Sequence, residues 1–401
     1  MRGGRGSRDD TPVEGFGGTM DNLDMSSTGT RRRLVIGAMT GTSMDGIDVA
    51  SAQIDGWGLG VQVQLVRHVS VGLGSLSAAL RRAAEQEPMS AEEFSRLALR
   101  LGELHAAAIA ELIEPGQMID LITVHGQTIV HQPPVSWQLI NPTPIARRFA
   151  CPVMYDLRQA DLAAGGQGAP ITPLADWILF WHDERSRVIV NLGGFCNVTV
   201  IPCAAGGDPL EDIEGFDVCA CNHVLDGVAR KVLDQPFDKD GRGAGAGKSN
   251  AALSSQLQGL LSDQASDGRS LGTGDELSDW ITAPSASLVP NDLLATVVEA
   301  VAGCIAGRLN TADADEVVLA GGGVMNRALV GRIRSMCEAP VRLSDELRIA
   351  AVAREALAMA VLGVLCADGI PITLPQVTGC TDPAPVAGTW CLPHGLASTP
   401  R

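Results

Sequence analysis

A short stretch with three hydroxyls, two glycines and one acid separates two apolar segments near the start of the chain. Residues 34–39 are largely apolar, Thr40-Gly41-Thr42-Ser43-Met44-Asp45-Gly46 follow, and a second apolar segment begins at Ile47. Glycines let backbone N–H groups approach an anion closely, and hydroxyls add donors. The pattern predicts a β-hairpin whose turn binds phosphate, with an ordinary hairpin turn as the alternative. The turn is not a P-loop, because the lysine of that motif is missing.

The same design recurs in the second half of the chain. Asn191-Leu192-Gly193-Gly194 separates two apolar strands within residues 187–202. A third glycine turn, Gly321-Gly322-Gly323, ends a strand and precedes a helix that we expect to open at about Asn326. Two phosphate-binding hairpins and one strand-to-helix turn resemble the arrangement of the actin-like, sugar-kinase superfamily. This resemblance implies an α/β fold of two actin-like lobes, which are duplicated ribonuclease H-like units, with an active-site cleft between them.

Composition narrows the class of protein. The chain has 401 residues, which is long for a single core and suits two lobes. A net charge of −16 argues against a general nucleic-acid binder. No apolar segment reaches the length of a membrane span, and we expect no membrane partner. The ten cysteines do not have the spacing of metal ligands. We recognise no signal peptide, and we therefore expect reduced thiols and a cytoplasmic protein.

Local composition predicts how the chain is divided. Residues 1–30 are rich in Gly, Ser, Asp and Thr, and we expect a disordered tail. Glycine and proline are dense in residues 157–177, which is typical of a crossover and not of an element interior. We therefore predict a first lobe over residues 31–168 and a second over residues 169–401, with the C-terminal segment packing back across the lobes.

Two further sites carry side chains that can do chemistry. His125-Gly126-Gln127-Thr128 follows a buried strand, which is a usual place for ligand residues in α/β folds. Asp217 is expected at the end of an apolar strand and just before a helix, where a carboxylate can act as a general base. A buried structural histidine and a helix-capping aspartate are the respective alternatives.

The motifs together resemble the family of anhydro-N-acetylmuramic acid kinases over about residues 33–393. The first hairpin is close to the family's opening signature, and further matches follow in the family's order. They are His125-Gly126-Gln127-Thr128 with His131, Gln138 and Asn141-Pro142, then Asp156-Leu157-Arg158, Asp161, residues 163–170, Gly215-Phe216-Asp217, Asn222, Gly321-Gly322-Gly323 with Asn326, Glu355 and residues 377–380.

The resemblance implies a reaction and a set of roles. ATP, Mg²⁺ and water would convert 1,6-anhydro-N-acetylmuramic acid to N-acetylmuramic acid 6-phosphate in peptidoglycan recycling, with Asp217 as the base that activates water. The implied ATP-binding residues are Gly41, Thr42, Ser43, Met44, Asp45, Gly46, Ile47, Asp48, Asn191, Gly193, Gly194, Gly321, Gly322, Gly323 and Asn326. The implied sugar-binding residues are His125, Gln127, Gln138, Arg158, Asp161 and Glu355. The metal ligands and a homodimeric state stay open.

Two departures from the family pattern keep alternatives open. Cys219-Ala220-Cys221 stands where the family has Gly-Pro-Gly, and added Cβ atoms could obstruct the approach of backbone to phosphate. Leu271 and Asp275 stand where the family has a lysine and an arginine, so two cations near an anion are lost. The alternatives are a different sugar kinase on the same scaffold and a non-catalytic sensor of nucleotides or muropeptides.

Overall fold

The computed structural model describes residues 31–41, 44–204, 209–266 and 288–394. The expected tail over residues 1–30, the hydroxyls of Thr42 and Ser43, and the departures at Leu271 and Asp275 all lie outside these ranges.

The first sheet is built around the predicted hairpin. Its strands lie in the order β13-β7-β4-β1-β2-β3. The first three in sequence are antiparallel neighbours, whereas β4 and β7 continue the sheet in parallel on the other side of β1. The bounds are β1 Arg32–Thr40, β2 Gly46–Asp55, β3 Gln62–Gly72, β4 Leu121–His125, β7 Val153–Tyr155 and β13 Thr389–Cys391.

The second sheet repeats this plan. Its order is β10-β9-β8-β11-β12, with β8, β9 and β10 antiparallel and β11 and β12 parallel to β8. The bounds are β8 Arg187–Leu192, β9 Phe195–Ile201, β10 Glu214–Ala220, β11 Glu316–Ala320 and β12 Val341–Leu343. Three antiparallel strands followed by two parallel ones, found twice, are two ribonuclease H-like units. The predicted duplicated α/β fold is confirmed.

Helices cover one face of the first sheet. They are α1 Leu76–Ala84, α2 Ala91–Ala110 and α3 Thr143–Phe149, and they share an aliphatic cluster with β1, β2 and β4. The expected capping box starts α2: the Glu93 N–H donates to the Ser90 hydroxyl at 3.2 Å, and the Ser90 N–H donates to the Glu93 carboxylate at 2.7 Å. A two-stranded sheet that the sequence did not predict follows β4, formed by β5 Gln127–Gln132 and β6 Val135–Leu139.

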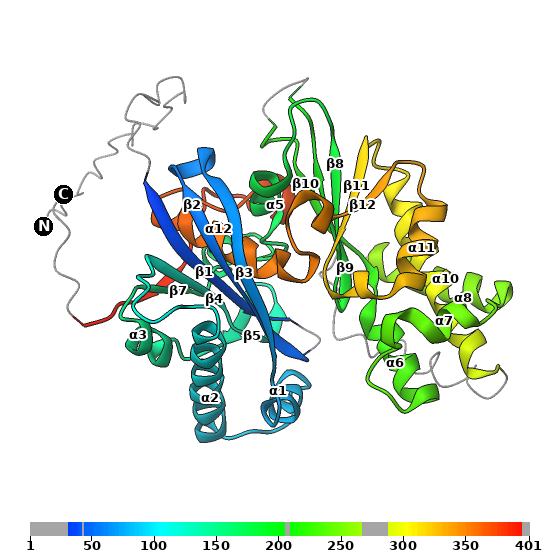
Figure 1. Ribbon diagram of the computed structural model, residues 1–401, viewed down its shortest axis with the longest axis horizontal. Helices are drawn as coiled ribbons and strands as arrows, with labels where there is room; N and C mark the ends of the chain where they lie inside the picture. The colour runs from blue at the N-terminus through cyan, green and yellow to red at the C-terminus, as the bar shows by residue number, and fades with distance from the viewer. Residues whose placement is uncertain (1–30, 42–43, 205–208, 267–287, 395–401) are drawn as a thin grey trace, which may run out of the picture. The chain divides into compact units, whose positions relative to one another are not determined.

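Helix α12, Arg354–Ala367, packs against β1, β2 and β4 on the other face of the first sheet, as Figure 1 shows. A Cβ added to Gly37 in β1 would lie 1.8 Å from the Ala356 carbonyl oxygen, so only glycine permits this approach. Apolar side chains of α12, of α5 (Pro173–Phe180) and of both sheets form one cluster. A buried ion pair between Arg354 and Asp176 joins the two helices.

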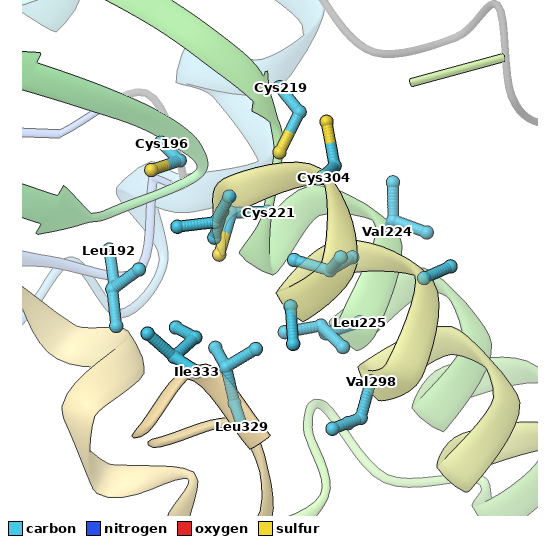
Figure 2. Packing of buried hydrophobic residues seen from close by; sticks show 14 of the residues in the cluster. Leu192, Cys196, Cys219, Cys221, Val224, Leu225, Val298, Cys304, Leu329 and Ile333 are labelled. Atoms are coloured by element: carbon cyan, nitrogen blue, oxygen red, sulfur yellow. The ribbon is translucent and has the colours of Figure 1, made fainter. Parts of the chain in front are cut away.

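One face of the second sheet contributes to the cluster around α12. The opposite face is covered by four longer helices, whose aliphatic side chains form the cluster in Figure 2. They are α6 Asn222–Leu233, α8 Ala251–Ser266, α10 Pro290–Leu309 and α11 Arg327–Met336. The remaining elements are short: α4 Gln159–Ala163, α7 Arg242–Ala246, α13 Pro375–Thr378, and the 3₁₀ helices η1 Gly58–Gly60, η2 Lys239–Gly241, η5 Gly322–Met325, η6 Ser344–Leu347 and η7 Ala351–Ala353. No helix in the described ranges is long and apolar enough to cross a membrane.

The crossover predicted over residues 157–177 is less irregular than expected. It contains α4 and the start of α5. Both short helices bury apolar side chains, which the glycine and proline content of the segment did not suggest. The C-terminal segment returns to the first sheet, where β13 pairs antiparallel with β7. The lobe boundary between residues 168 and 169 stays a prediction.

Candidate active site

The first hairpin turn follows β1 and precedes β2, as predicted. The Met44 N–H donates to the Gly41 carbonyl at 3.2 Å, and the Ser77 hydroxyl donates to the Met44 carbonyl at 2.9 Å, so α1 supports the turn. The Thr40 hydroxyl at the end of β1 is buried and has no hydrogen-bond partner among the described residues. A buried hydroxyl of this kind can serve a ligand.

The second hairpin turn rests on the start of α6. The N–H groups of Cys221 and His223 donate to the Gly194 carbonyl at 2.9 and 3.2 Å, and that of Asn222 donates to the Gly193 carbonyl at 3.0 Å. The side chains of Cys219 and Cys221 are fully buried in the aliphatic cluster of the second sheet, as Figure 2 shows. These two side chains therefore pack into the core below the glycine turn, and their effect on the approach of backbone to phosphate stays a prediction.

The third glycine turn packs against the second. Gly321 has a φ of +85°, which favours glycine, and an added Cβ would lie 2.6 Å from the Asn191 side-chain oxygen. Asn326 caps α11 as expected, because its side-chain oxygen accepts a hydrogen bond from the Leu329 N–H at 3.1 Å. Two of the three glycine turns thus share one location, at the ends of β8 and β11.

Two carboxylates lie beside these turns. Burial raises the pKa of Asp48 in β2, and the nearby Asp45 raises it further, against a hydrogen bond from Ser70. Burial also raises the pKa of Glu355 at the start of α12, and Asp48 adds to this effect. The Asn191 side chain lowers the pKa of Glu355 against these effects, which places the second hairpin beside the start of α12. Three elements therefore bring Asp48, Glu355 and Asn191 together.

The described residues hold no group of three or more His, Cys, Asp or Glu side chains placed to hold a metal ion. Mg²⁺ that travels with a nucleotide uses one or two carboxylates and otherwise phosphate oxygens and water. Asp48 and Glu355 fit that role, because each carboxylate is desolvated and the two repel each other, and a divalent cation would relieve both effects.

Arg158 is the centre of the second part of the site. Its Nε donates to the His125 Nε2 at 3.1 Å, and its Nη1 donates to the Gly168 carbonyl at 2.6 Å. Burial lowers the pKa of Arg158 to about 10. The charges of Asp217 and Glu355 oppose this lowering, so both carboxylates act electrostatically on the guanidinium. Residues from β4, β10 and α12 thus meet around one arginine.

Asp217 does not lie where the sequence suggested. It is in the middle of β10 and pairs with Asn197, whereas Cys219 pairs with Cys196. Val218 is therefore the extra residue of a β-bulge directly after Asp217. A bulge redirects the neighbouring side chains of a strand, and bulges are frequent next to active sites. The expected position at a strand end is corrected to a bulge within the strand.

The other predicted sugar-binding residues fall into two groups. Asp161 is 4% exposed and uses both carboxylate oxygens within the chain: the Gly168 N–H and the Thr378 hydroxyl each donate to it at 2.6 Å. Its role in the structure is to hold the loop that carries Gly168. In contrast, the side-chain oxygens of Gln127 and Gln138 are buried and accept no hydrogen bond from the described residues.

Ser136 is a site residue that the sequence did not reveal. Its hydroxyl accepts from the Gln138 amide at 2.8 Å and lies 2.9 Å from the His131 Nδ1. This contact fixes the amide nitrogen of Gln138, so the amide oxygen stays available to a ligand. No motif pointed to Ser136, because its importance depends on the pairing of β5 with β6.

Comparisons with known proteins agree with the motifs. Residues 33–390 match the family model described as anhydro-N-acetylmuramic acid kinase. A protein named anhydro-N-acetylmuramic acid kinase from Salinibacter ruber is 34% identical over 381 residues, which are 88% of this chain and 95% of that protein. One of the same name from Bordetella pertussis is 33% identical over 383 residues, covering 89% of this chain and 97% of that protein.

Two of the solved structures that match resemble the chain only distantly. The activator of the 2-hydroxyisocaproyl-CoA dehydratase from Clostridium difficile with bound ADPNP is 12% identical, with a TM-score of 0.43, and covers 82% of this chain and 94% of that one. A ROK family glucokinase from Streptomyces griseus in complex with glucose and AMPPNP is 15% identical, with a TM-score of 0.36, and covers 82% and 99%. TM-scores this low carry no argument about the chain beyond the strand order described above. By its family match and its relatives, the chain belongs to the anhydro-N-acetylmuramic acid kinase family.

Proposed function

We propose that the chain is an ATP-dependent kinase that opens 1,6-anhydro-N-acetylmuramic acid with water and phosphorylates O6, which yields N-acetylmuramic acid 6-phosphate and ADP. One observation supports the chemistry most strongly: the charges of Asp217 and Glu355 act on the guanidinium of Arg158, which His125 and Gly168 hold in place. Membership of the family supports the substrate. The alternatives of another sugar kinase or a sensor find no support in the relatives.

Asp217 is the general base in this proposal. A positive guanidinium nearby favours the ionised carboxylate, which is the form that can take a proton. Asp217 orients a water molecule and removes its proton as the water oxygen attacks the anomeric carbon. The bond between that carbon and the bridging O6 breaks, and O6 forms the new bond to the γ-phosphorus while ADP leaves.

The histidines beside Arg158 act as neutral groups. Burial lowers the pKa of His125 to about 3, and Arg158 contributes to this lowering. Burial and Arg158 likewise lower the pKa of His131 to about 4. At neutral pH these rings can position a sugar by hydrogen bonds but carry no charge. Gln127 and Gln138 offer buried acceptors to the hydroxyl or amide N–H groups of the same ligand.

The glycine turns bind the nucleotide in this proposal. Backbone N–H groups at the first and second hairpins hold the phosphates, and Gly321-Gly322-Gly323 lie beside the nucleoside. Asp48 and Glu355 would hold Mg²⁺, which would offset the negative charge of the phosphates. The two lobes over residues 31–168 and 169–401 would each contribute one hairpin. The reaction belongs to peptidoglycan recycling, in the cytoplasm.

An ADP-release assay with purified protein tests the proposal. The anhydro sugar should release ADP at a rate well above the background with ATP alone, whereas glucose, N-acetylglucosamine and N-acetylmuramic acid should not. In oxygen-18 water, the label should enter the sugar at C1, because water attacks the anomeric carbon. ADP release with a plain hexosamine and none with the anhydro sugar would refute the proposed substrate.

A further inference from the structure

Four thiols gather at the end of the aliphatic cluster nearest to Asp217. Cys196 comes from β9, Cys219 and Cys221 from β10 and the start of α6, and Cys304 from α10. Figure 2 shows the four side chains, with Cys219 and Cys304 adjacent. Cys196, Cys219 and Cys221 are fully buried, whereas Cys304 is 8% exposed. All ten cysteines are free thiols.

Cys304 differs from the others because a cavity reaches it. The cavity has a volume of about 370 Å³ and is lined by residues of β10, α8 and α10, among them Asp217, Ser262, Cys304 and Arg308. A water molecule occupies about 30 Å³ of liquid, so the cavity is large enough for a solute of the size of hydrogen peroxide. The cavity thus connects a nearly buried thiol to solvent on the side of the bulge that carries Asp217.

The contacts of Cys304 also favour its thiolate form. The adjacent Cys219 thiol lowers the pKa of the Cys304 thiol to about 7, and Ser262 lowers it as well, against the opposing effect of burial. The Ser262 hydroxyl lies 3.7 Å from the Cys304 sulfur. The same contact with Cys304, together with burial, raises the pKa of Cys219. Because the cavity is lined by Cys304 and not by the fully buried Cys219, Cys304 is the thiol of the pair that a solute can reach, and its lowered pKa favours the thiolate.

We propose that Cys304 is an oxidation site, and that Cys219 resolves it to a disulfide that alters the β-bulge beside Asp217. The Cys304 thiolate attacks one oxygen of hydrogen peroxide and becomes a sulfenic acid, with release of hydroxide, which takes a proton to form water. The Cys219 sulfur then attacks the Cys304 sulfur, and the second oxygen leaves as water. Peroxide receives the two electrons, and two thiols become one disulfide.

The disulfide acts on Asp217 through the strand. Cys219 is two residues from Asp217 and is separated from it by the bulge residue Val218. A covalent bond to α10 would draw Cys219 toward that helix and shift the bulge. Displacement of a catalytic group by about 1 Å can cost about 10²-fold in rate. This consequence for turnover rests on the proposed function, whereas oxidation itself does not.

Thiol counting on the full chain tests the oxidation. Reduced protein is treated with a small molar excess of hydrogen peroxide, then denatured, titrated for thiols and weighed intact. The expected result is eight thiols in place of ten, with a mass lower by about 2 Da, and recovery of both thiols with dithiothreitol. Cys304→Ser, or Cys304→Ala if serine is not tolerated, should keep all its nine thiols reduced.

Two variants identify the partner. Cys219→Ser should stop at a Cys304 sulfenic acid, which dimedone traps. Cys196→Ser is the matched control, because Cys196 is the cross-strand neighbour of Cys219 and should not be needed; it should still lose two thiols. The proposal is overturned if the folded wild type keeps ten thiols, or if Cys304→Ser loses the same two.

Turnover measured on the same samples tests the link to Asp217. Oxidised wild type should be at least about tenfold slower than reduced protein and should recover with dithiothreitol, whereas Cys304→Ser should be unaffected by peroxide. Loss of two thiols with unchanged turnover would overturn the link. If the reduced protein shows no kinase activity at all, the proposed function fails, and the thiol count still decides whether Cys304 and Cys219 form the oxidation site.

Discussion

The guanidinium Nε of Arg158 donates a hydrogen bond to the imidazole Nε2 of His125 over 3.1 Å. Because an arginine is always a donor, the histidine nitrogen must be an acceptor, and the ring proton is on Nδ1. With a pKa of about 3, His125 stays neutral over the whole range in which an enzyme of this kind would be assayed. His125 therefore fixes the direction of Arg158, and the proton from water is left to a carboxylate.

Asp217→Asn should lower turnover by about 10²- to 10⁴-fold, because the amide has nearly the same shape but cannot take a proton. Affinity for ATP should change little, since the glycine turns hold the phosphates in our proposal. Steady-state kinetics measures turnover, calorimetric titration measures the affinity for ATP, and the melting temperature shows whether the fold is retained.

Asp212→Asn is the matched control, because Asp212 is exposed and precedes the same strand. It should leave turnover, ATP affinity and melting temperature unchanged. If Asp217→Asn melts several degrees lower and yet turns over at the wild-type rate, Asp217 has a structural role and the mechanism is wrong.

Asp48→Asn should stabilise the ligand-free protein and weaken binding of Mg²⁺-ATP. Burial and Asp45 raise the pKa of this carboxyl, so its ionised form is unfavourable until a cation arrives. Thermal unfolding without ligand should show a higher melting temperature, and calorimetry should show a lower affinity for Mg²⁺-ATP. A variant that melts at a lower temperature without ligand would contradict the charge argument.

Asp226→Asn should raise stability at pH 8 but not at pH 4. Burial raises the pKa of Asp226 from 3.8 to about 7, with Arg230 lowering it and Asp45 raising it. Between these values the folded state holds a proton that the unfolded state has lost, so this group's contribution to stability falls as pH rises from about 4 to about 7. The full difference corresponds to at most about 4 kcal/mol. Equal melting curves for wild type and variant at pH 8 would contradict this.

Strand periodicity and turn composition predicted both hairpins, because an alternating segment and a glycine turn are local properties of the sequence. The partner of α12 was not predictable in the same way. All of its residues from Ala356 to Cys366 are buried, so the helix has no polar face that would indicate which side points to solvent. Its position follows from Gly37 and from the pair between Arg354 and Asp176, which are 178 residues apart.

The same difference between local and long-range information applies to the residues of the site. Residue types and order singled out His125, Arg158, Asp217 and Glu355, but the sequence did not show that one arginine holds them together. The bulge at Val218 depends on how β10 pairs with β9, which no single strand reveals. The packing of Cys219 was not predictable for a related reason: a strand residue faces one side of its sheet or the other, and here the side chain is buried in the core.

Asp368→Ala should destabilise the protein by about 3–5 kcal/mol, because it leaves a buried arginine unpaired. The two carboxylate oxygens of Asp368 accept hydrogen bonds from the Arg33 guanidinium at 2.6 and 3.0 Å, and one of them also accepts from the Gly58 N–H at 2.9 Å. The pair connects the start of β1 to the end of α12. Chemical denaturation measures the change.

The exposed pair between Glu92 and Arg96 on α2 provides the comparison, because both side chains are more than 70% exposed. Glu92→Ala should produce no measurable change in the denaturation midpoint, since exposed ion pairs contribute little. Equal effects of the two substitutions would show that burial of the Arg33 pair is not what makes it important.

Gly322→Val should weaken ATP binding at least tenfold without unfolding the protein. A Cβ added to Gly322 meets no atom within 4 Å, so the fold has room for the side chain. In our proposal that room is where the nucleoside lies, and a branched side chain would fill it.

Gly331→Val is the matched control: a Cβ added there also meets no atom within 4 Å, but Gly331 lies on α11, past the cap at Asn326. Both variants should melt near the wild-type temperature, and only Gly322→Val should lose affinity in a calorimetric titration with ATP. Unchanged affinity in a folded Gly322→Val would remove the third glycine turn from the nucleotide site, whereas a loss in both variants would point to an indirect effect through α11.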